Sequence, residues 1–156
     1  MRDNNFKCDA DSKVRIMEAM KNAYQPNPFT YEIDSNPTAR IDCRAIGITK
    51  EGKTLHYAIE CKHRNCTPST YECYFCEPAK FDTIKWATVK DEVDKGIIAN
   101  EFSDGSVYLW DIDDLDPSNT VKTRIARTTV GTGAYNSEKI YQYRILMPLT
   151  KGTRIK

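Results

Sequence analysis

Apolar and polar residues alternate along two neighbouring segments, at about residues 40–49 and 54–64, and predict a β-hairpin. A three-residue loop that ends at Gly52 joins the two strands. Such loops favour a type I turn followed by a residue with positive φ, which glycine adopts without a steric penalty. Counting outward from this loop places Asp42 directly opposite Glu60.

The two faces of the predicted hairpin differ in chemistry. One face offers Asp42, Glu60 and Lys62, because residues two apart on a strand share a face. Directly opposed carboxylates repel each other. A divalent cation would offset the repulsion, since Mg²⁺ is commonly held by one or two carboxylates, and an ion pair with Lys62 on a solvated face is the alternative. The other face is apolar and suits packing against a helix, with Ile41, Cys43, Ala45, Tyr57, Ile59 and Cys61.

Helices are predicted on both sides of this hairpin. The first covers about residues 13–24, with Ser12 as its N-cap. Alternation at residues 29–34 predicts a strand between this helix and the hairpin. The second helix covers about residues 79–95 and is expected to stop at Gly96. The apolar stripe of the first helix consists of Ile16, Met20 and Ala23.

The element order α-β-β-β-α-β predicts an α/β fold with a central mixed β-sheet flanked by helices. Strands at residues 97–102 and 106–112 flank an Asp-Gly turn, which is a strong hairpin signal. We expect one domain, 1–156, with its core at about 12–112, a C-terminal loop and strand at 113–150, and a basic, frayed tail at 151–156. The less regular parts are an irregular segment at 65–76, a polar loop at 119–135 and a last strand at 139–147.

The composition is that of an ordinary globular protein, with 40% hydrophobic and 29% charged residues. No apolar run approaches the ~20 residues of a membrane span, and the N-terminus lacks the apolar core of a signal peptide. We therefore expect an intracellular, cytoplasmic protein without a membrane partner. The net charge is only +1, so contacts to nucleic acid would have to come from local basic clusters such as Arg64, Lys80 and Lys85.

Six cysteines are notable in a chain expected to be intracellular, where disulfides are disfavoured. His63 and Cys66, and Cys73 and Cys76, form two pairs with the x₂ spacing of zinc ligands. The gap between the pairs is short, and no glycine turns the backbone beside them. Two interpretations stay open: a structural Zn²⁺ site made by these four residues, or buried free thiols that pack as small apolar groups.

Asp42, followed eighteen residues later by Glu60-Cys61-Lys62, resembles the D…(D/E)-x-K signature of the PD-(D/E)XK nuclease superfamily. A helix before the hairpin and another after it match the core order of that superfamily. The resemblance covers about residues 12–112, and Ile41 stands where the motif name has proline. It implies a restriction-endonuclease-like fold and a phosphodiester-cleaving enzyme.

The resemblance also implies roles for individual residues. Asp42 and Glu60 would hold one or two Mg²⁺ or Mn²⁺ ions, with the Cys61 carbonyl as a further ligand. Lys62 would position or deprotonate a water or stabilise the transition state. Nucleic-acid phosphates would be held by Arg64, Lys80 and Lys85.

Several properties follow less directly from the resemblance. DNA is favoured over RNA as the nucleic-acid partner, and enzymes of this kind often act as homodimers. A phage or mobile-element origin suits the small size of the chain. The alternative function is a non-catalytic domain on the nuclease fold that binds nucleic acid or protein. A structural Zn²⁺ ion would stabilise this domain if the cysteine cluster binds zinc.

Overall fold

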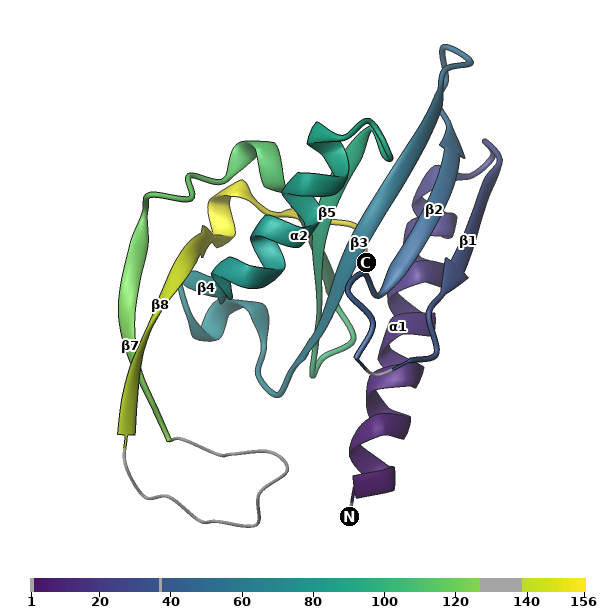
Figure 1. Cartoon of the computed structure of the whole chain (residues 1–156). Helices are drawn as coiled ribbons and strands as arrows, with labels where there is room; N and C mark the ends of the chain where they lie inside the picture. Colours follow the sequence, from purple (N-terminus) through teal and green to yellow (C-terminus); the bar gives the residue numbers. More distant parts are fainter. Residues whose placement is uncertain (1, 37, 127–138) are drawn as a thin grey trace.

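A six-stranded mixed sheet forms the centre of the molecule (Figure 1). The computed structural model describes residues 2–36, 38–126 and 139–156. In spatial order, the strands are β1 (Phe29–Ile33), β2 (Cys43–Ile48), β3 (Thr54–Arg64), β5 (Lys95–Phe102), β6 (Val107–Asp111) and β9 (Thr153–Arg154). Neighbouring strands run antiparallel except β3 and β5, which run parallel.

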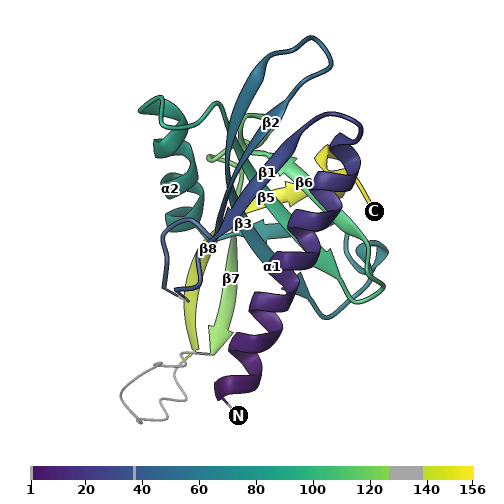
Figure 2. The same cartoon turned by 90° about the vertical axis from the view of Figure 1, so that its right-hand side faces the viewer.

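The two faces of this sheet are covered by different elements (Figures 1 and 2). Helix α1 (Arg2–Tyr24) packs on one face, and helix α2 (Pro78–Val89) packs on the other. A second, three-stranded sheet lies on the α2 side, in the order β4 (Cys73–Cys76), β8 (Lys139–Pro148) and β7 (Thr120–Ala126). Short 3₁₀ turns occur at Pro68–Thr70, Ile112–Asp114 and Leu149–Lys151.

Each face of the main sheet has its own apolar core. On the α1 side, Ile16, Met17 and Met20 pack against the buried faces of β2, β3 and β5. On the α2 side, Phe81 and Ile84 share a core with residues of β5, β6 and β8. Among the described residues, no helix has the length and apolar character required to cross a membrane.

The predicted hairpin is confirmed in its register. Ile48 pairs with Thr54 and Cys43 with Ile59, as the loop predicts. The first strand begins at Cys43 rather than at about residue 40, so Asp42 lies just beyond the last pair and does not itself pair with Glu60. The loop closes with Gly52 at φ 81°, the positive value that the turn requires. This register is predictable from local sequence because the loop length determines which residues oppose each other.

Helix α1 differs from its prediction. It begins at Arg2, and Ser12 lies within it rather than capping it. The buried Ser12 hydroxyl donates to Glu101 of β5, so the helix tolerates this residue because a tertiary hydrogen bond satisfies its side chain. Ala23 is exposed, and Ala19 is buried in its place. Ile41 packs partly against the α2-side core rather than with the apolar face under α1.

Other differences lie in the second half of the chain. Helix α2 ends at Val89 instead of about residue 95, because Asp91 adopts a positive φ of 56° and the chain turns toward β5. Gly96 therefore lies in β5. The predicted irregular segment 65–76 contains β4, and the predicted polar loop at 119–135 contains β7. Residues 127–135 of that loop lie outside the described residues. The tail is not frayed, because β9 pairs with β6.

Gly96 allows α2 to lie close to β5, and we expect Gly96→Ala to destabilise the protein. An added Cβ would lie 2.4 Å from the Ile84 Cγ2 atom and 2.7 Å from the Ile112 Cδ1 atom, both in the core. Overpacking of this kind lowers the free energy of unfolding by about 1–3 kcal/mol. Urea denaturation measures the change. The loss should shrink when Ile84→Ala is also present, and an equal loss in both backgrounds would contradict the steric explanation.

Candidate active site

Asp42 and Glu60 meet where β2 separates from β3. The pairing of the two strands ends at Cys43 and Ile59, so the following stretch of β3 has no neighbouring strand on that side. The Asp42 side chain takes the place of one: its Oδ2 atom accepts a hydrogen bond of 2.9 Å from the Cys61 N–H. This bond fixes Asp42 beside the middle of β3.

Two lysines from opposite sides of the sheet form ion pairs with these carboxylates. Lys13 of α1 is only 4% exposed, and its Nζ atom lies 3.0 Å from Asp42 Oδ1. Lys80 of α2 places its Nζ atom 3.1 Å from Glu60 Oε1. Both carboxylate residues are 8% exposed. The carboxylate repulsion expected from the sequence is therefore offset by Lys13 and Lys80.

The environment changes the protonation of Glu60. Burial, followed by the negative charge of Asp42, raises the pKa of Glu60 to about 7, although Lys80 acts in the opposite direction. Burial alone would lower the pKa of Lys80, but the Glu60 carboxylate outweighs it and the pKa is raised. A carboxyl group that exchanges its proton near neutral pH is typical of functional sites.

The donor atoms present fit a small divalent cation. Asp42 and Glu60 supply two adjacent carboxylates, which contact lysines and a backbone N–H. An ionised carboxylate has about four acceptor positions, so oxygen lone pairs remain for a cation. Mg²⁺ is typically bound by one or two carboxylates together with phosphate and water. The backbone N–H of Cys61 donates to Asp42, so Cys61 lies beside the carboxylates. The role of its carbonyl oxygen as a metal ligand stays a prediction.

The remaining basic residues of the sequence prediction fall into two groups. Lys62 is exposed and lines a pocket together with Glu60, Arg64 and Lys80. Arg64 is half-buried and donates from Nη2 to the carbonyl of Phe75 at 3.0 Å. Lys85 does not line this pocket, because it forms an ion pair of 2.7 Å with Asp113.

The four predicted zinc ligands are not brought together. The His63 Nδ1 atom lies 3.0 Å from Glu101, which also binds Ser12 and Arg15 of α1. Cys76 belongs to the core on the opposite face of the sheet. Burial, followed by the charge of Glu60, raises the pKa of the Cys76 thiol to about 12, which disfavours the thiolate that zinc requires.

The predicted grouping of these four residues is therefore wrong. In the described parts of the chain, no three His, Cys, Asp or Glu side chains gather in a way that could hold a metal ion. Cys73 and Cys76 lie three residues apart in β4, so their side chains point to opposite faces of that sheet.

Sequence reasoning missed three side chains that the fold brings to this region. Lys13 lies three and four residues before Ile16 and Met17, a spacing that places it on the buried side of α1. Asn100 shares a strand face with Ile98 and the buried Phe102, where a polar residue is unexpected. These two signals were present in the sequence. The third residue, Arg144, had none, because only the pairing of β8 with β4 brings it here.

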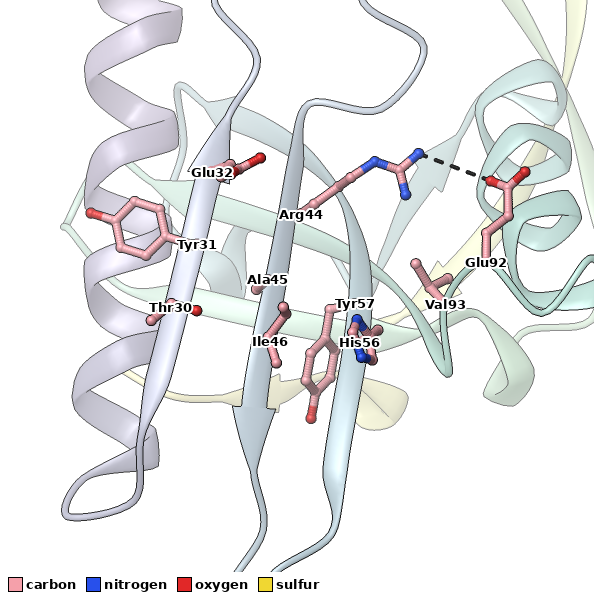
Figure 3. Close-up of a pocket in the computed structure, with 10 residues that line it drawn as sticks. All are labelled: Thr30, Tyr31, Glu32, Arg44, Ala45, Ile46, His56, Tyr57, Glu92 and Val93. Carbon is pink, nitrogen blue, oxygen red and sulfur yellow. Dashed lines mark ion pairs between the residues drawn. The ribbon is translucent and has the colours of Figure 1, made fainter.

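Open space also lies beside Asp42. A hollow of about 370 Å³ is lined by Asp42, Glu32 and Arg44 among others. A second hollow, of about 300 Å³, lies over β1, β2 and β3, where Arg44 forms an ion pair of 4.0 Å with Glu92 (Figure 3). Glu32 and Arg44 line both hollows. The surface is therefore recessed from Asp42 along β1 and β2.

Comparisons with known proteins identify the fold. No protein-family model matches the sequence, and a search of curated proteins finds no match. Among solved structures, the chain is similar to Hjc of Archaeoglobus fulgidus, a Holliday junction resolvase from an archaeal hyperthermophile. The TM-score is 0.52 at 10% sequence identity, and the match covers 89% of this chain and 87% of the resolvase. The predicted phage or mobile-element origin is not addressed by this match. The chain has the restriction-endonuclease-like fold of that resolvase, as the sequence predicted.

Proposed function

We propose that this protein is a metal-dependent nuclease that hydrolyses phosphodiester bonds in DNA. The observation that carries the proposal is the pair of buried carboxylates, Asp42 and Glu60, beside Lys62 at the point where β2 and β3 separate. Similarity in fold to a Holliday junction resolvase supports DNA, and branched DNA in particular, as the substrate to test. The same similarity makes a homodimer the assembly to test.

Each residue of the site has a distinct role in this proposal. Asp42 and Glu60 would hold Mg²⁺ or Mn²⁺, which when bound polarises the scissile phosphate and lowers the pKa of a water ligand. Lys62 is exposed at the pocket and would place its ammonium against the phosphate or the attacking water. The Cys61 N–H holds Asp42 in position. Lys80 stabilises the charged form of Glu60, which is the form that binds a cation.

The proposal is tested by a cleavage assay on labelled single-stranded, duplex and branched DNA and on RNA, with Mg²⁺, with Mn²⁺ and with EDTA. We expect cleavage of DNA that requires the divalent cation and falls by about a hundredfold or more in Lys62→Met. Lys53→Met is the matched control, since Lys53 is exposed beside the hairpin loop at the far end of β3. Full activity of Lys62→Met, or equal cleavage in EDTA, would reject the proposed mechanism.

One observation favours a second candidate, a nucleic-acid-binding domain without catalysis. Lys13 and Lys80 already balance the charges of Asp42 and Glu60, so the site is electrostatically compensated without a cation. A calorimetric titration with Mn²⁺ separates the two functions. A nuclease should bind the ion with an affinity that falls in Asp42→Asn, whereas the binding domain should show DNA binding and no Mn²⁺ binding at these carboxylates.

A further inference from the structure

A small pocket of about 40 Å³ continues from Glu60 toward the second sheet. Its polar lining comes from four elements that are distant in the sequence, β3, α2, β5 and β8, and from Glu77, which directly precedes α2. A single water needs roughly 10–15 Å³, so the pocket has room for about three oxygen-sized atoms and none for a base. The polar residues of the lining are Glu60, Lys62, Arg64, Glu77, Lys80, Asn100 and Arg144.

Two guanidinium groups meet at this pocket. Burial, opposed in part by the neighbouring Cys66, lowers the pKa of Arg64, and the positive charge of Arg144 lowers it further. The Nε atoms of both arginines are buried and have no hydrogen-bond partner in the described chain. Glu60 and Glu77 also line the pocket, but neither arginine forms an ion pair with a described carboxylate, so each keeps an Nε–H donor without a partner.

Asn100 is a third unsatisfied group at the same place. It lies opposite Lys62 in the parallel pairing of β3 and β5, and its side chain is fully buried. Neither its Nδ2 nor its Oδ1 atom has a hydrogen-bond partner in the described chain. Buried amides are almost always hydrogen-bonded in native proteins, so an unpartnered one lining a pocket points to a ligand.

We propose that Arg64, Arg144 and Asn100 form an anion site that holds a phosphate group of the nucleic-acid strand, next to the phosphate that is cleaved. Phosphate oxygens would accept from both Nε–H groups and from the Asn100 amide, and they would neutralise the two guanidinium charges. Lys62 and Glu60 line the same pocket, which joins this site to the carboxylates. The identity of the phosphate as part of a strand rests on the proposed nuclease function, whereas the anion site itself does not.

Inorganic phosphate tests the anion site without any substrate. Thermal unfolding is followed in phosphate and in chloride at equal ionic strength, for the wild type and for Arg144→Gln. Phosphate also stabilises proteins by exclusion from their surface, so the quantity that matters is the difference between the two proteins. We expect phosphate to raise the melting temperature more in the wild type than in the variant. Equal shifts would overturn the site.

Two further variants exclude a general effect of charge or of folding. Arg154→Gln removes the same charge from an exposed position on β9, at the edge of the main sheet, and should keep the full phosphate response. Asn100→Leu removes the unpartnered amide, so it should unfold at an equal or higher temperature in chloride and lose part of the phosphate response. A lower melting temperature with an unchanged phosphate response would show that Asn100 serves packing only and would overturn its assignment.

Fluorescence anisotropy with labelled oligonucleotides in EDTA identifies the source of the phosphate. We assign the site to an internal phosphodiester. Arg144→Gln should therefore weaken oligonucleotide binding by about tenfold. It should also reduce the slope of log binding constant against log salt concentration by about 0.7–0.9 in magnitude. The loss should be equal for strands with a 5′-hydroxyl and a 5′-phosphate. A loss confined to the 5′-phosphorylated strand would overturn the internal assignment.

The two proposals fail in distinguishable ways. An unchanged phosphate response and unchanged oligonucleotide binding in Arg144→Gln, together with metal-dependent cleavage by the wild type, would reject the anion site alone. A phosphate response that depends on Arg144, together with no cleavage of any substrate, would reject the nuclease function and leave the anion site standing.

Discussion

Asp42→Asn is expected to reduce metal-dependent cleavage by at least about a hundredfold, because the cation loses one of its two carboxylates and a bound metal contributes several kcal/mol to the reaction. Asparagine keeps an oxygen of the same size, so it can still accept from the Cys61 N–H. Single-turnover cleavage of the best DNA substrate measures the effect. The matched control is Asp113→Asn, since Asp113 is exposed and pairs with Lys85 away from the pocket.

The same substitution breaks the buried ion pair with Lys13, so stability has to be measured beside activity. Removing one partner of a buried pair can cost about 3–5 kcal/mol, whereas removing both costs less. We therefore expect the double variant Lys13→Met, Asp42→Asn to be more stable than Asp42→Asn and equally inactive. Recovery of cleavage in the double variant, or full cleavage in the single one, would contradict the role of Asp42 as a metal ligand.

Glu60→Gln is expected to remove a pH dependence of stability in metal-free protein. The pKa of Glu60 is raised from the usual 4.5 to about 7, so between these values the folded state holds a proton that the unfolded state releases. Stability from this group is therefore fully present below about pH 4.5 and is lost as the pH rises through 7. One pKa unit corresponds to ~1.4 kcal/mol, which gives a total on the order of 3 kcal/mol.

Urea denaturation in EDTA at pH 5 and at pH 8 measures this effect. Other groups titrate in the same interval, so the result is the difference between the wild type and Glu60→Gln rather than either curve alone. We expect the variant to be the more stable protein at pH 8 and to differ much less from the wild type at pH 5. Parallel pH dependence in the two proteins would show that Glu60 has an ordinary pKa.

The sequence predicted those parts of the site that depend on local geometry. The proximity of Asp42 and Glu60 follows from the three-residue loop at Gly52, because loop length sets the register of the hairpin whose last pair, Cys43 and Ile59, directly precedes these two residues. The Asp-Gly turn between β5 and β6 is confirmed for the same reason, with Gly105 at φ 83°.

Long-range packing determined the parts that the sequence did not predict. The spacing of Lys13 from Ile16 and Met17 predicts a buried position, but its partner Asp42 is set by the packing of α1 on the main sheet. Arg144 joins the pocket through the pairing of β8 with β4, which no local pattern reports. A stripe based on Ile16 and Met20 is confirmed, whereas a cap at Ser12 is wrong because Glu101 of a distant strand satisfies that hydroxyl.

The late position of β8 and β9 in the chain sets the order in which the two halves of the site can form. The β2–β3 hairpin brings Asp42 and Glu60 together through contacts that are local in the sequence, so these contacts can form early during synthesis. The pocket lacks Arg144 until β8 has been made, and the main sheet lacks its last strand until residue 154 has been added. A nascent chain therefore has both carboxylates and Arg64 in place before Arg144, so the pocket gains its second guanidinium group only after β8 has paired with β4.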